Sequence, residues 1–229
     1  MNPRVVLFGG TFDPPHIGHL LMAQLAHEET QAEVWWLPAP VPPHKLDAPP
    51  ATPYDVRVEM VRALVAGHSG MQVSTIEAEL PKPSYTVDTV AALRQRHPGT
   101  SFLFLIGSDS LAALDTWHEA ARLTEAVSFL VAVRSGYPFA ATYERMRSKL
   151  PRLVAQPLEM PLIDVSSSWI RERAARGLPL CGVVPEAVVR IWRRACGASN
   201  SFARACSGCG SGGDAVKGEG SVARGTEAG

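Results

Sequence analysis

The sequence has no excess of charge of either sign, because its 229 residues include 22 lysine and arginine and 22 aspartate and glutamate side chains. A chain without a basic field has no electrostatic reason to bind nucleic acid or a membrane surface. Its longest apolar stretches, near 102–106 and 126–133, are far shorter than the roughly 20 residues that span a bilayer. The start also lacks the apolar core of a signal peptide, since Phe8 runs directly into Gly9-Gly10. We therefore expect a cytoplasmic protein that binds neither nucleic acid nor a membrane.

Cysteine is scarce, and its positions exclude several kinds of site. Cys181, Cys196, Cys206 and Cys209 all lie in the last quarter of the chain. Such a distribution is poor material for a disulfide framework. Cys206 and Cys209 have C-x-x-C spacing, but no second pair and no nearby histidine complete a metal site. We assign these cysteines no catalytic or metal-binding role.

Short apolar runs alternate with segments of helical spacing along most of the chain. Runs of strand length occupy 4–8, 33–37, 71–76, 102–106, 127–133 and 157–163. This alternation predicts an α/β fold with a parallel sheet flanked by helices and ligands at the carboxyl ends of the strands. We assign residues 1–195 to this domain. Residues 196–229 are rich in glycine, alanine and serine, so we expect a disordered tail.

The most informative stretch runs from Gly9 to His19 and follows the order strand, glycine turn, helix. Gly9 and Gly10 let the backbone approach a ligand closely. His16 and His19 fall about one turn apart near a helix N-terminus, where free N–H groups and partial positive charge suit phosphate. Both rings can add donors that become cationic as a polyphosphate arrives. A zinc site would need a third ligand, for which His44 is the obvious candidate.

The form G-G-T-F-D-P-x-H-x-G-H resembles the nucleotidylyltransferase superfamily, and in particular its nicotinate-nucleotide adenylyltransferases. The resemblance implies a Rossmann-like nucleotidylyltransferase fold. It also implies transfer of adenylyl from ATP to nicotinate mononucleotide, giving nicotinate adenine dinucleotide and pyrophosphate, a step of NAD biosynthesis. In this family the loop corresponding to Gly9, Gly10, Thr11 and Phe12 binds ATP.

A proline-rich loop follows the second expected strand and ends in His44-Lys45. Proline pre-orders such a loop, so both side chains are presented at low entropic cost. It is similar to the family's P-x-x-x-P-P-H-K stretch, which implies that His44 contributes to the nicotinate mononucleotide site and Lys45 to the ATP site. The alternative is a stiff surface loop.

Ser84-Tyr85-Thr86 precedes an expected helix over 87–95, and both Ser84 and Thr86 are candidate caps. This S-Y-T segment is similar to the one that borders the pyridine nucleotide in the family. Free N–H groups at the start of that helix would suit a nicotinate carboxylate.

Gly107 and Asp109 close the strand near 102–106, where ribose or metal is often met, although a helix cap is the plainer alternative. With Thr116-Trp117 they match the family pattern G-x-D-S-L followed by T-W. The resemblance implies that Gly107 and Asp109 belong to the ATP site and that Trp117 stacks on the pyridinium ring.

A second anion site is expected where serines open a helix ahead of Arg171. The family pattern here is I-S-x-T-x-I-R, and Val165 and Ser168 replace isoleucine and threonine. The resemblance implies that Ser167, Ser168 and Arg171 hold the pyrophosphate end of ATP. The alternative is a serine-capped helix with a solvated arginine.

The implied acceptor phosphate is already ionised at neutral pH, so catalysis by His16, His19 and Arg171 should consist of positioning and charge neutralisation. We expect Mg2+ to be bound mainly through the ATP phosphates, with no metal site made of protein ligands. Nicotinamide mononucleotide or phosphopantetheine as acceptor, and a nucleotide sensor without catalysis, are the alternatives. The sequence leaves open whether the chain forms a homo-oligomer.

Overall fold

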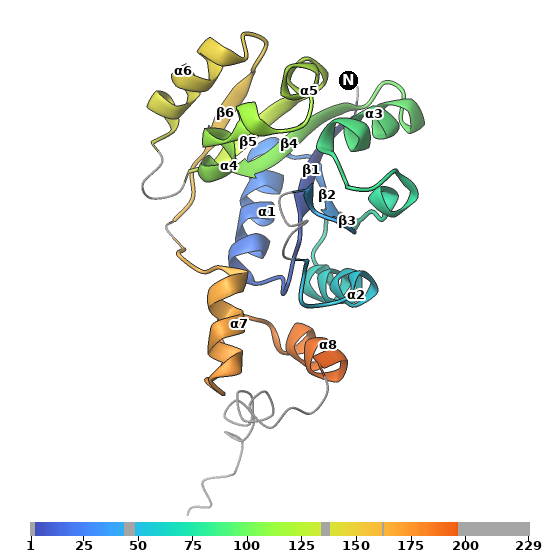
Figure 1. Ribbon diagram of the computed structural model, residues 1–229, viewed down its shortest axis with the longest axis vertical. Coiled ribbons are helices and arrows are strands. Elements are labelled where there is room, and N and C mark those ends of the chain that lie inside the picture. Colours follow the sequence, from blue (N-terminus) through green and yellow to red (C-terminus); the bar gives the residue numbers. More distant parts are fainter. Residues whose placement is uncertain (1–2, 44–48, 134–137, 162, 197–229) are drawn as a thin grey trace, which may run out of the picture.

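The computed structural model describes residues 3–43, 49–133, 138–161 and 163–196, and in them a six-stranded sheet runs through the centre (Figure 1). The strands are β1 (Arg4–Gly10), β2 (Glu33–Pro38), β3 (Met71–Val73), β4 (Ser101–Gly107), β5 (Ser128–Ala132) and β6 (Ala155–Leu158). All neighbouring strands pair in parallel, in the order β3-β2-β1-β4-β5-β6. The predicted parallel α/β sheet is therefore confirmed, in the strand order of a Rossmann-like fold.

Helices cover both faces of this sheet. They are α1 (Ile17–Thr30), α2 (Tyr54–Val65), α3 (Thr86–Arg96), α4 (Ser108–Ala112), α5 (Ala120–Ala126), α6 (Phe139–Lys149), α7 (Ser167–Ala175) and α8 (Glu186–Cys196), with 3-10 turns η2 (Ile76–Glu79) and η3 (Leu114–Thr116). Among the described residues, none of the helices combines the length and the apolar composition needed to cross a membrane.

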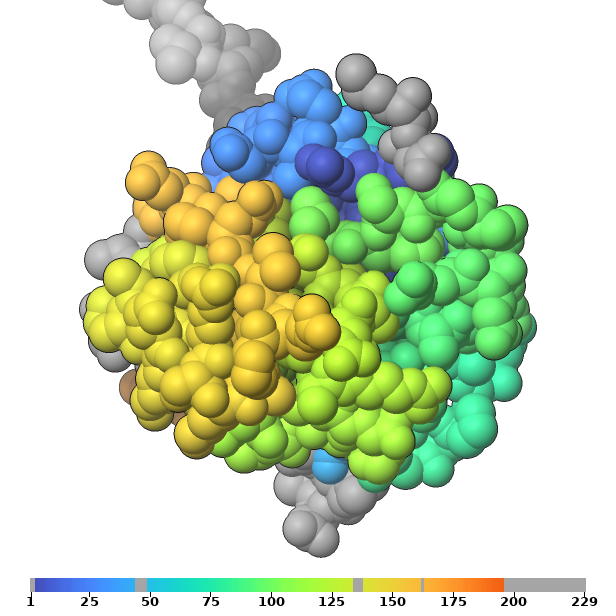
Figure 2. All heavy atoms as spheres, turned by 90° about the horizontal axis from the view of Figure 1, so that it is seen from above, coloured from blue at the N-terminus to red at the C-terminus, as the bar shows by residue number. Residues whose placement is uncertain are grey.

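The four inner strands, β1, β2, β4 and β5, bury most of both faces, which explains their almost continuous apolar sequence. Val6 and Phe8 of β1 pack into a core shared with α1, α2, α7 and α8. Val5 and Leu7, which point the opposite way, pack into a second core with α3, α4, α5 and α6. Figure 2 shows the outer side of this second layer, where α6 and β6 (yellow to orange) lie beside the light green α4–α5 segment.

The chain reverses its direction of sheet growth at β1, which lies between β2 and β4. The glycines that end β1 and β4, Gly10 and Gly107, lie at the same edge of the sheet because the strands are parallel. Ligands in open α/β sheets bind at such a switch point. The fold therefore brings the first predicted motif beside Gly107 and Asp109.

Three local predictions differ from the structure. The strand expected over 71–76 ends at Val73, and η2 follows it. The last strand covers Ala155–Leu158 rather than 157–163, and Pro157 is tolerated inside it because β6 lies at the sheet edge. Tyr85, with no side-chain cap, precedes α3, so neither Ser84 nor Thr86 is its N-cap. The Ser84 hydroxyl instead accepts the Val41 N–H at 3.5 Å.

The cysteines also depart from expectation, because Cys181 is disulfide-bonded. Spacing along the chain did not indicate this bond, since disulfide formation depends on which cysteines meet in three dimensions. The described part of the chain ends with α8 at Cys196. Residues 197–229 of the expected tail therefore lie outside the described residues, and the disorder of the tail stays a prediction.

Candidate active site

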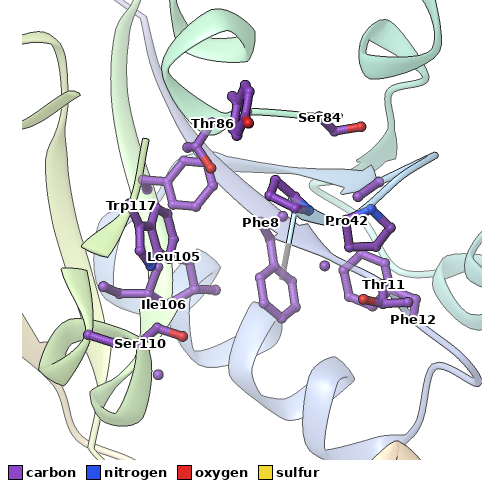
Figure 3. A pocket seen from close by; sticks show the side chains of 18 of the residues that line it. Phe8, Thr11, Phe12, Pro42, Ser84, Thr86, Leu105, Ile106, Ser110 and Trp117 are labelled. Carbon is purple, nitrogen blue, oxygen red and sulfur yellow. The ribbon is translucent and has the colours of Figure 1, made fainter. Parts of the chain in front are cut away.

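A cavity of about 810 Å³ opens at the carboxyl ends of β1 and β4. Its volume is in the range typical of small-molecule sites. In Figure 3, Trp117 and Ser110 lie on one side of it, Thr11 and Phe12 on the other, and Ser84 and Thr86 above. The sequence-predicted residues that line it are Gly9, Gly10, Thr11, Phe12, His19, Ser84, Tyr85, Thr86, Gly107, Asp109 and Trp117. The residues expected to bind ATP after β1 and β4 and those expected to border the pyridine nucleotide thus line the same cavity.

The other predicted residues lie elsewhere. His16 is buried at the start of α1, with 2% of its surface exposed. Ser167, Ser168 and Arg171 belong to α7. Ser167 and Arg171 contact the loop that follows β1, and Ser168 Oγ accepts a hydrogen bond from Arg171. His44 and Lys45 lie outside the described residues, so their expected roles stay predictions.

The glycine turn is required by the aromatic rings packed around it. A Cβ atom added at Gly10 would lie 2.8 Å from the Phe12 ring, and one at Gly9 would lie 3.0 Å from the Phe104 ring. Phe12 itself is buried and has a left-handed backbone, with φ of 52°. A bulky residue with this φ is an outlier that persists only where its surroundings hold it. Rigid packing therefore shapes this loop as much as any need to approach a ligand.

The two histidines cap α1, and this determines which ring nitrogen carries a proton. His16 Nδ1 accepts the Gly18 N–H at 3.2 Å, and His19 Nδ1 accepts the His16 N–H at 3.3 Å. A neutral ring with an accepting Nδ1 carries its proton on Nε2. In this cap each neutral ring donates through Nε2. The expectation that the rings become cationic as a polyphosphate arrives stays a prediction. The ring centroids are 3.8 Å apart.

The segment from Ser166 to Arg171 contacts the loop that follows the glycine turn. Ser166 is the N-cap of α7 and accepts the Trp169 N–H at 3.2 Å. Ser167 Oγ donates to Pro14 O at 2.9 Å, and Arg171 Nη1 donates to Asp13 O at 2.6 Å. The two motifs, far apart in sequence, are therefore in contact through the loop that follows β1.

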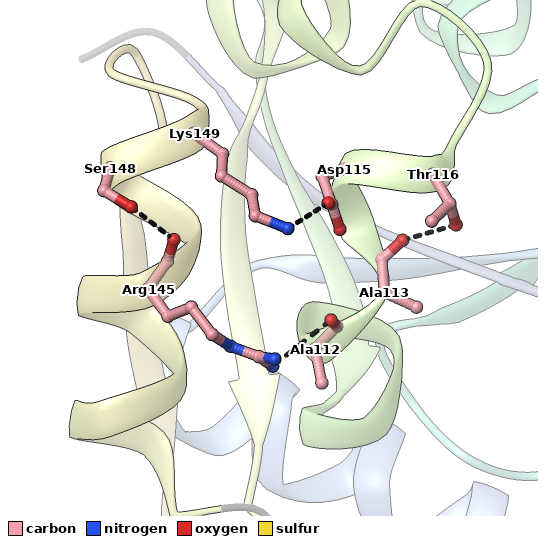
Figure 4. Close-up of polar contacts among 7 residues, drawn as sticks. All are labelled: Ala112, Ala113, Asp115, Thr116, Arg145, Ser148 and Lys149. Carbon is pink, nitrogen blue, oxygen red and sulfur yellow. Dashed lines mark hydrogen bonds and ion pairs between the residues drawn. The ribbon is translucent and has the colours of Figure 1, made fainter.

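Aromatic residues wall the opposite end of the cavity. The Tyr85 and His118 rings stack with centroids 4.0 Å apart, and Trp117 meets Phe104 edge-on at 6.2 Å. Helix α6 braces the segment that carries Trp117 (Figure 4). Lys149 forms an ion pair with Asp115 at 2.6 Å, and Arg145 Nη2 donates to Ala112 O at 3.4 Å. This wall is therefore built before any ligand enters.

A carboxyl group that the sequence analysis did not single out also lines the cavity. Glu77 is 5% exposed, and its Oε1 accepts the Thr89 hydroxyl at 3.0 Å. Its Oε2 has no hydrogen-bond partner among the described residues. Burial raises the pKa of Glu77 to about 7, although the hydroxyls of Thr89 and Ser84 oppose the rise. The sequence did not indicate this burial, because the run Ile76-Glu77-Ala78-Glu79 contains two glutamates and nothing in it distinguishes buried Glu77 from exposed Glu79.

Arg57 is a second residue that the sequence analysis passed over. It is 1% exposed and donates to four backbone carbonyls around the site. A signal was available, since Arg57 shares a helix face with Val61 and Leu64 at spacings of four and seven residues. Because charged side chains are rarely buried unless they are paired, an arginine on the core-facing side of a helix indicates that its guanidinium has buried hydrogen-bond or charge partners.

Comparisons with known proteins identify the family of the chain. A family model described as cytidylyltransferase-like matches residues 7–173. A protein of Exiguobacterium sibiricum named "Probable nicotinate-nucleotide adenylyltransferase" is 44% identical over 189 residues, covering 82% of this chain and 95% of the relative. One of the same name from Symbiobacterium thermophilum is 41% identical over 190 residues, covering 82% of this chain and 91% of the relative.

A solved structure shares the fold. The nicotinic acid mononucleotide adenylyltransferase of Plasmodium falciparum, complexed with NaAD, matches with a TM-score of 0.68 at 18% identity. The match covers 82% of this chain and 94% of that chain. From its extended similarity to the bacterial relatives and its match to the family model, the chain belongs to the cytidylyltransferase-like family and, within it, to the nicotinate-nucleotide adenylyltransferases.

Proposed function

We propose that the protein transfers the adenylyl group of ATP to nicotinate mononucleotide, forming nicotinate adenine dinucleotide and releasing pyrophosphate. The observation that carries this proposal is the single cavity in which the glycine turn and His19 face the Ser84–Thr86 segment and Trp117. One end offers backbone and imidazole donors for phosphates, and the other offers aromatic walls for a pyridine ring.

In this reaction a phosphate oxygen of the acceptor attacks the α-phosphorus of ATP, and the bond from that phosphorus to the departing pyrophosphate breaks. The acceptor phosphate is ionised at neutral pH, so no side chain has to remove a proton. His19 would donate from Nε2 to the transferring phosphate, while His16 supports it from the buried side of the cap. Fixed donors of this kind stabilise charge that develops in the transition state.

The remaining assignments follow the same geometry. Gly9, Gly10, Thr11 and Phe12 would surround the triphosphate, and Gly107 and Asp109 would face the adenosine ribose. Ser167, Ser168 and Arg171 would bind the pyrophosphate end, next to the loop that Ser167 and Arg171 already contact. Lys45 would add positive charge there.

At the acceptor end, Trp117 would stack on the pyridinium ring, and Ser84, Tyr85 and Thr86 would border the nucleotide together with His44. The first turn of α3 has no side-chain cap, and its Asp88 N–H donates to Tyr85 O, so the Thr86 and Val87 N–H groups are the candidates to bind a carboxylate. A carboxylate on the pyridine ring offers two charged acceptor oxygens to these N–H groups, whereas an amide offers one neutral acceptor oxygen.

A divalent metal would accompany ATP in this reaction. In the described ranges, no group of three or more histidine, cysteine, aspartate or glutamate side chains could hold a metal ion. Mg2+ would be bound mainly through the ATP phosphate oxygens and water, where it would neutralise phosphate charge. The cytoplasmic location stays a prediction, and the oligomeric state stays open.

The test is pyrophosphate release from Mg-ATP with nicotinate mononucleotide, nicotinamide mononucleotide or phosphopantetheine as acceptor. We expect release with the nicotinate compound to be far faster than with the others. Release with only another acceptor would overturn the substrate while keeping the transfer chemistry. ATP binding without release for any acceptor would indicate a nucleotide sensor.

A further inference from the structure

Arg57 is a buried cation directly behind the glycine turn. It lies in the first turn of α2, is 1% exposed, and is among the largest fully buried side chains of the described residues. Arg62, in the last turn of the same helix, is exposed. A buried guanidinium is costly unless its donors are satisfied, so its contacts indicate what it is for.

The guanidinium joins the loops that follow β1 and β2. Nη1 donates to Thr11 O at 2.7 Å and to Ala39 O at 2.9 Å. Nη2 donates to Pro40 O at 3.2 Å, and Nε donates to Thr52 O at 3.1 Å. One rigid, planar group thus sets the distance between two loops that meet at the carboxyl edge of the sheet.

The bond to Thr11 also orients a backbone donor. The only cis peptides in the described part of the chain precede Pro14 and Pro83, so the bond between Thr11 and Phe12 is trans. In a trans peptide the C=O and N–H groups point in opposite directions. With the Thr11 carbonyl turned onto Arg57, the Phe12 N–H is turned away from it, and both residues line the cavity.

The loop is therefore held from two sides. Arg57 binds the carbonyl of Thr11, and Arg171 of α7 binds the carbonyl of Asp13 at 2.6 Å. The Asp13 carboxylate accepts the Ala51 N–H at 2.9 Å and lies close enough to interact with Arg57 electrostatically. Burial lowers the pKa of Arg57, whereas Asp13 and Tyr54 oppose that change and favour the cation.

We propose that Arg57 is a positioning residue for the ATP phosphates, because its guanidinium holds the Thr11 carbonyl and so turns the Phe12 N–H of the loop toward the cavity. The inference rests on the proposed function only in naming ATP as the ligand. If the inference is correct, Arg57 affects binding of the ATP phosphates and does not affect binding of the base or the ribose.

The experiment compares binding of ATP and of adenosine to the purified protein and to Arg57→Lys, which keeps the charge but loses the planar fork. We expect ATP affinity to fall on the order of tenfold or more, as for the loss of hydrogen bonds to a charged group. Adenosine affinity should change less than about threefold, since nucleoside binding does not use the loop donors. Arg62→Lys, on the exposed face of the same helix, is the matched control and should change neither.

Arg57→Gln is the second variant, and thermal unfolding shows which variants are folded at the temperature of the binding measurement. Equal loss of ATP and adenosine affinity would show that Arg57 only supports the fold, and unchanged ATP affinity would exclude any positioning role. Because no acceptor is present, the result does not depend on which acceptor the enzyme uses. Failure of the unmodified protein to release pyrophosphate with nicotinate mononucleotide would overturn the proposed function and leave this comparison valid.

Discussion

At the scale of single residues, His19 is the side chain whose chemistry is most exposed to test. Its Nδ1 is used by the cap of α1, so Nε2 is the atom that can donate to a phosphate in the cavity. Removing one such donor from an acyl-transfer or phosphoryl-transfer site costs on the order of a hundredfold in turnover. We expect His19→Ala to lose at least this much in steady-state pyrophosphate release while ATP still binds measurably.

Two further variants sharpen this prediction. In His19→Asn the side-chain oxygen can still accept the His16 N–H, but Nε2 is gone, so turnover should fall as in His19→Ala. His68 is an exposed histidine outside the cavity lining, and His68→Ala should keep full turnover. Near-normal turnover of His19→Ala would remove His19 from the catalytic groups.

At the scale of elements, two adjacent serines at the start of α7 have different roles, so that one variant should affect only stability and the other should also affect turnover. Ser166 caps the helix through its hydroxyl, whereas the Ser167 hydroxyl donates to Pro14 O in the loop after β1. Replacing an N-cap serine with alanine costs about 1 kcal/mol of stability. Ser166→Ala should therefore lower the free energy of unfolding by about this amount, measured by urea denaturation, with turnover unchanged.

Ser167→Ala is the matched variant, and it should lower turnover as well, by about tenfold, because the loop and the pyrophosphate end of the site lose a contact. Full turnover of Ser167→Ala would remove Ser167 from the residues proposed to bind the pyrophosphate end. A loss confined to Ser166→Ala would show that the wrong serine has been assigned to the site.

At the scale of the whole molecule, Glu77 links global stability to pH. Its pKa is about 7 in the folded protein and near 4.5 in an unfolded chain. Below 4.5 both states hold the proton; as the pH rises, the unfolded chain releases it first, and the folded state loses stability until the pH exceeds 7. A shift of this size corresponds to about 3 kcal/mol.

Glu77→Gln should remove this dependence, since an amide does not titrate. Between about pH 5 and about pH 8, the free energy of unfolding of the unmodified protein should fall by about 2–3 kcal/mol relative to Glu77→Gln. Glu79→Gln is the control, because Glu79 lies on the same 3-10 turn with an exposed side chain. Parallel pH profiles for the unmodified protein and Glu77→Gln would show that Glu77 is ionised in the folded state at all these pH values.

The order of strands and helices could be predicted from local patterns. The apolar runs of β1 and β4 and the glycines that end them are short-range features, and the structure extends each predicted strand by only a few residues. Element boundaries were less predictable. Val73 ends β3 early, and the expected cap at Ser84 is missing because its hydroxyl bonds Val41, 43 residues away.

Much of the candidate site was also predictable, because the motif from Gly9 to His19 is contiguous and its chemistry is local. The sequence by itself determined the α/β class, the glycine turn followed by a helix that begins near His16 and His19, and the family to which the chain belongs. Tertiary structure alone decided that Arg57 bonds Thr11 across 46 positions, that Glu77 is buried in the cavity wall, and that Cys181 forms a disulfide. Periodicity and turn chemistry act over a few residues, whereas the partner of a buried polar group depends on which distant segments packing brings together.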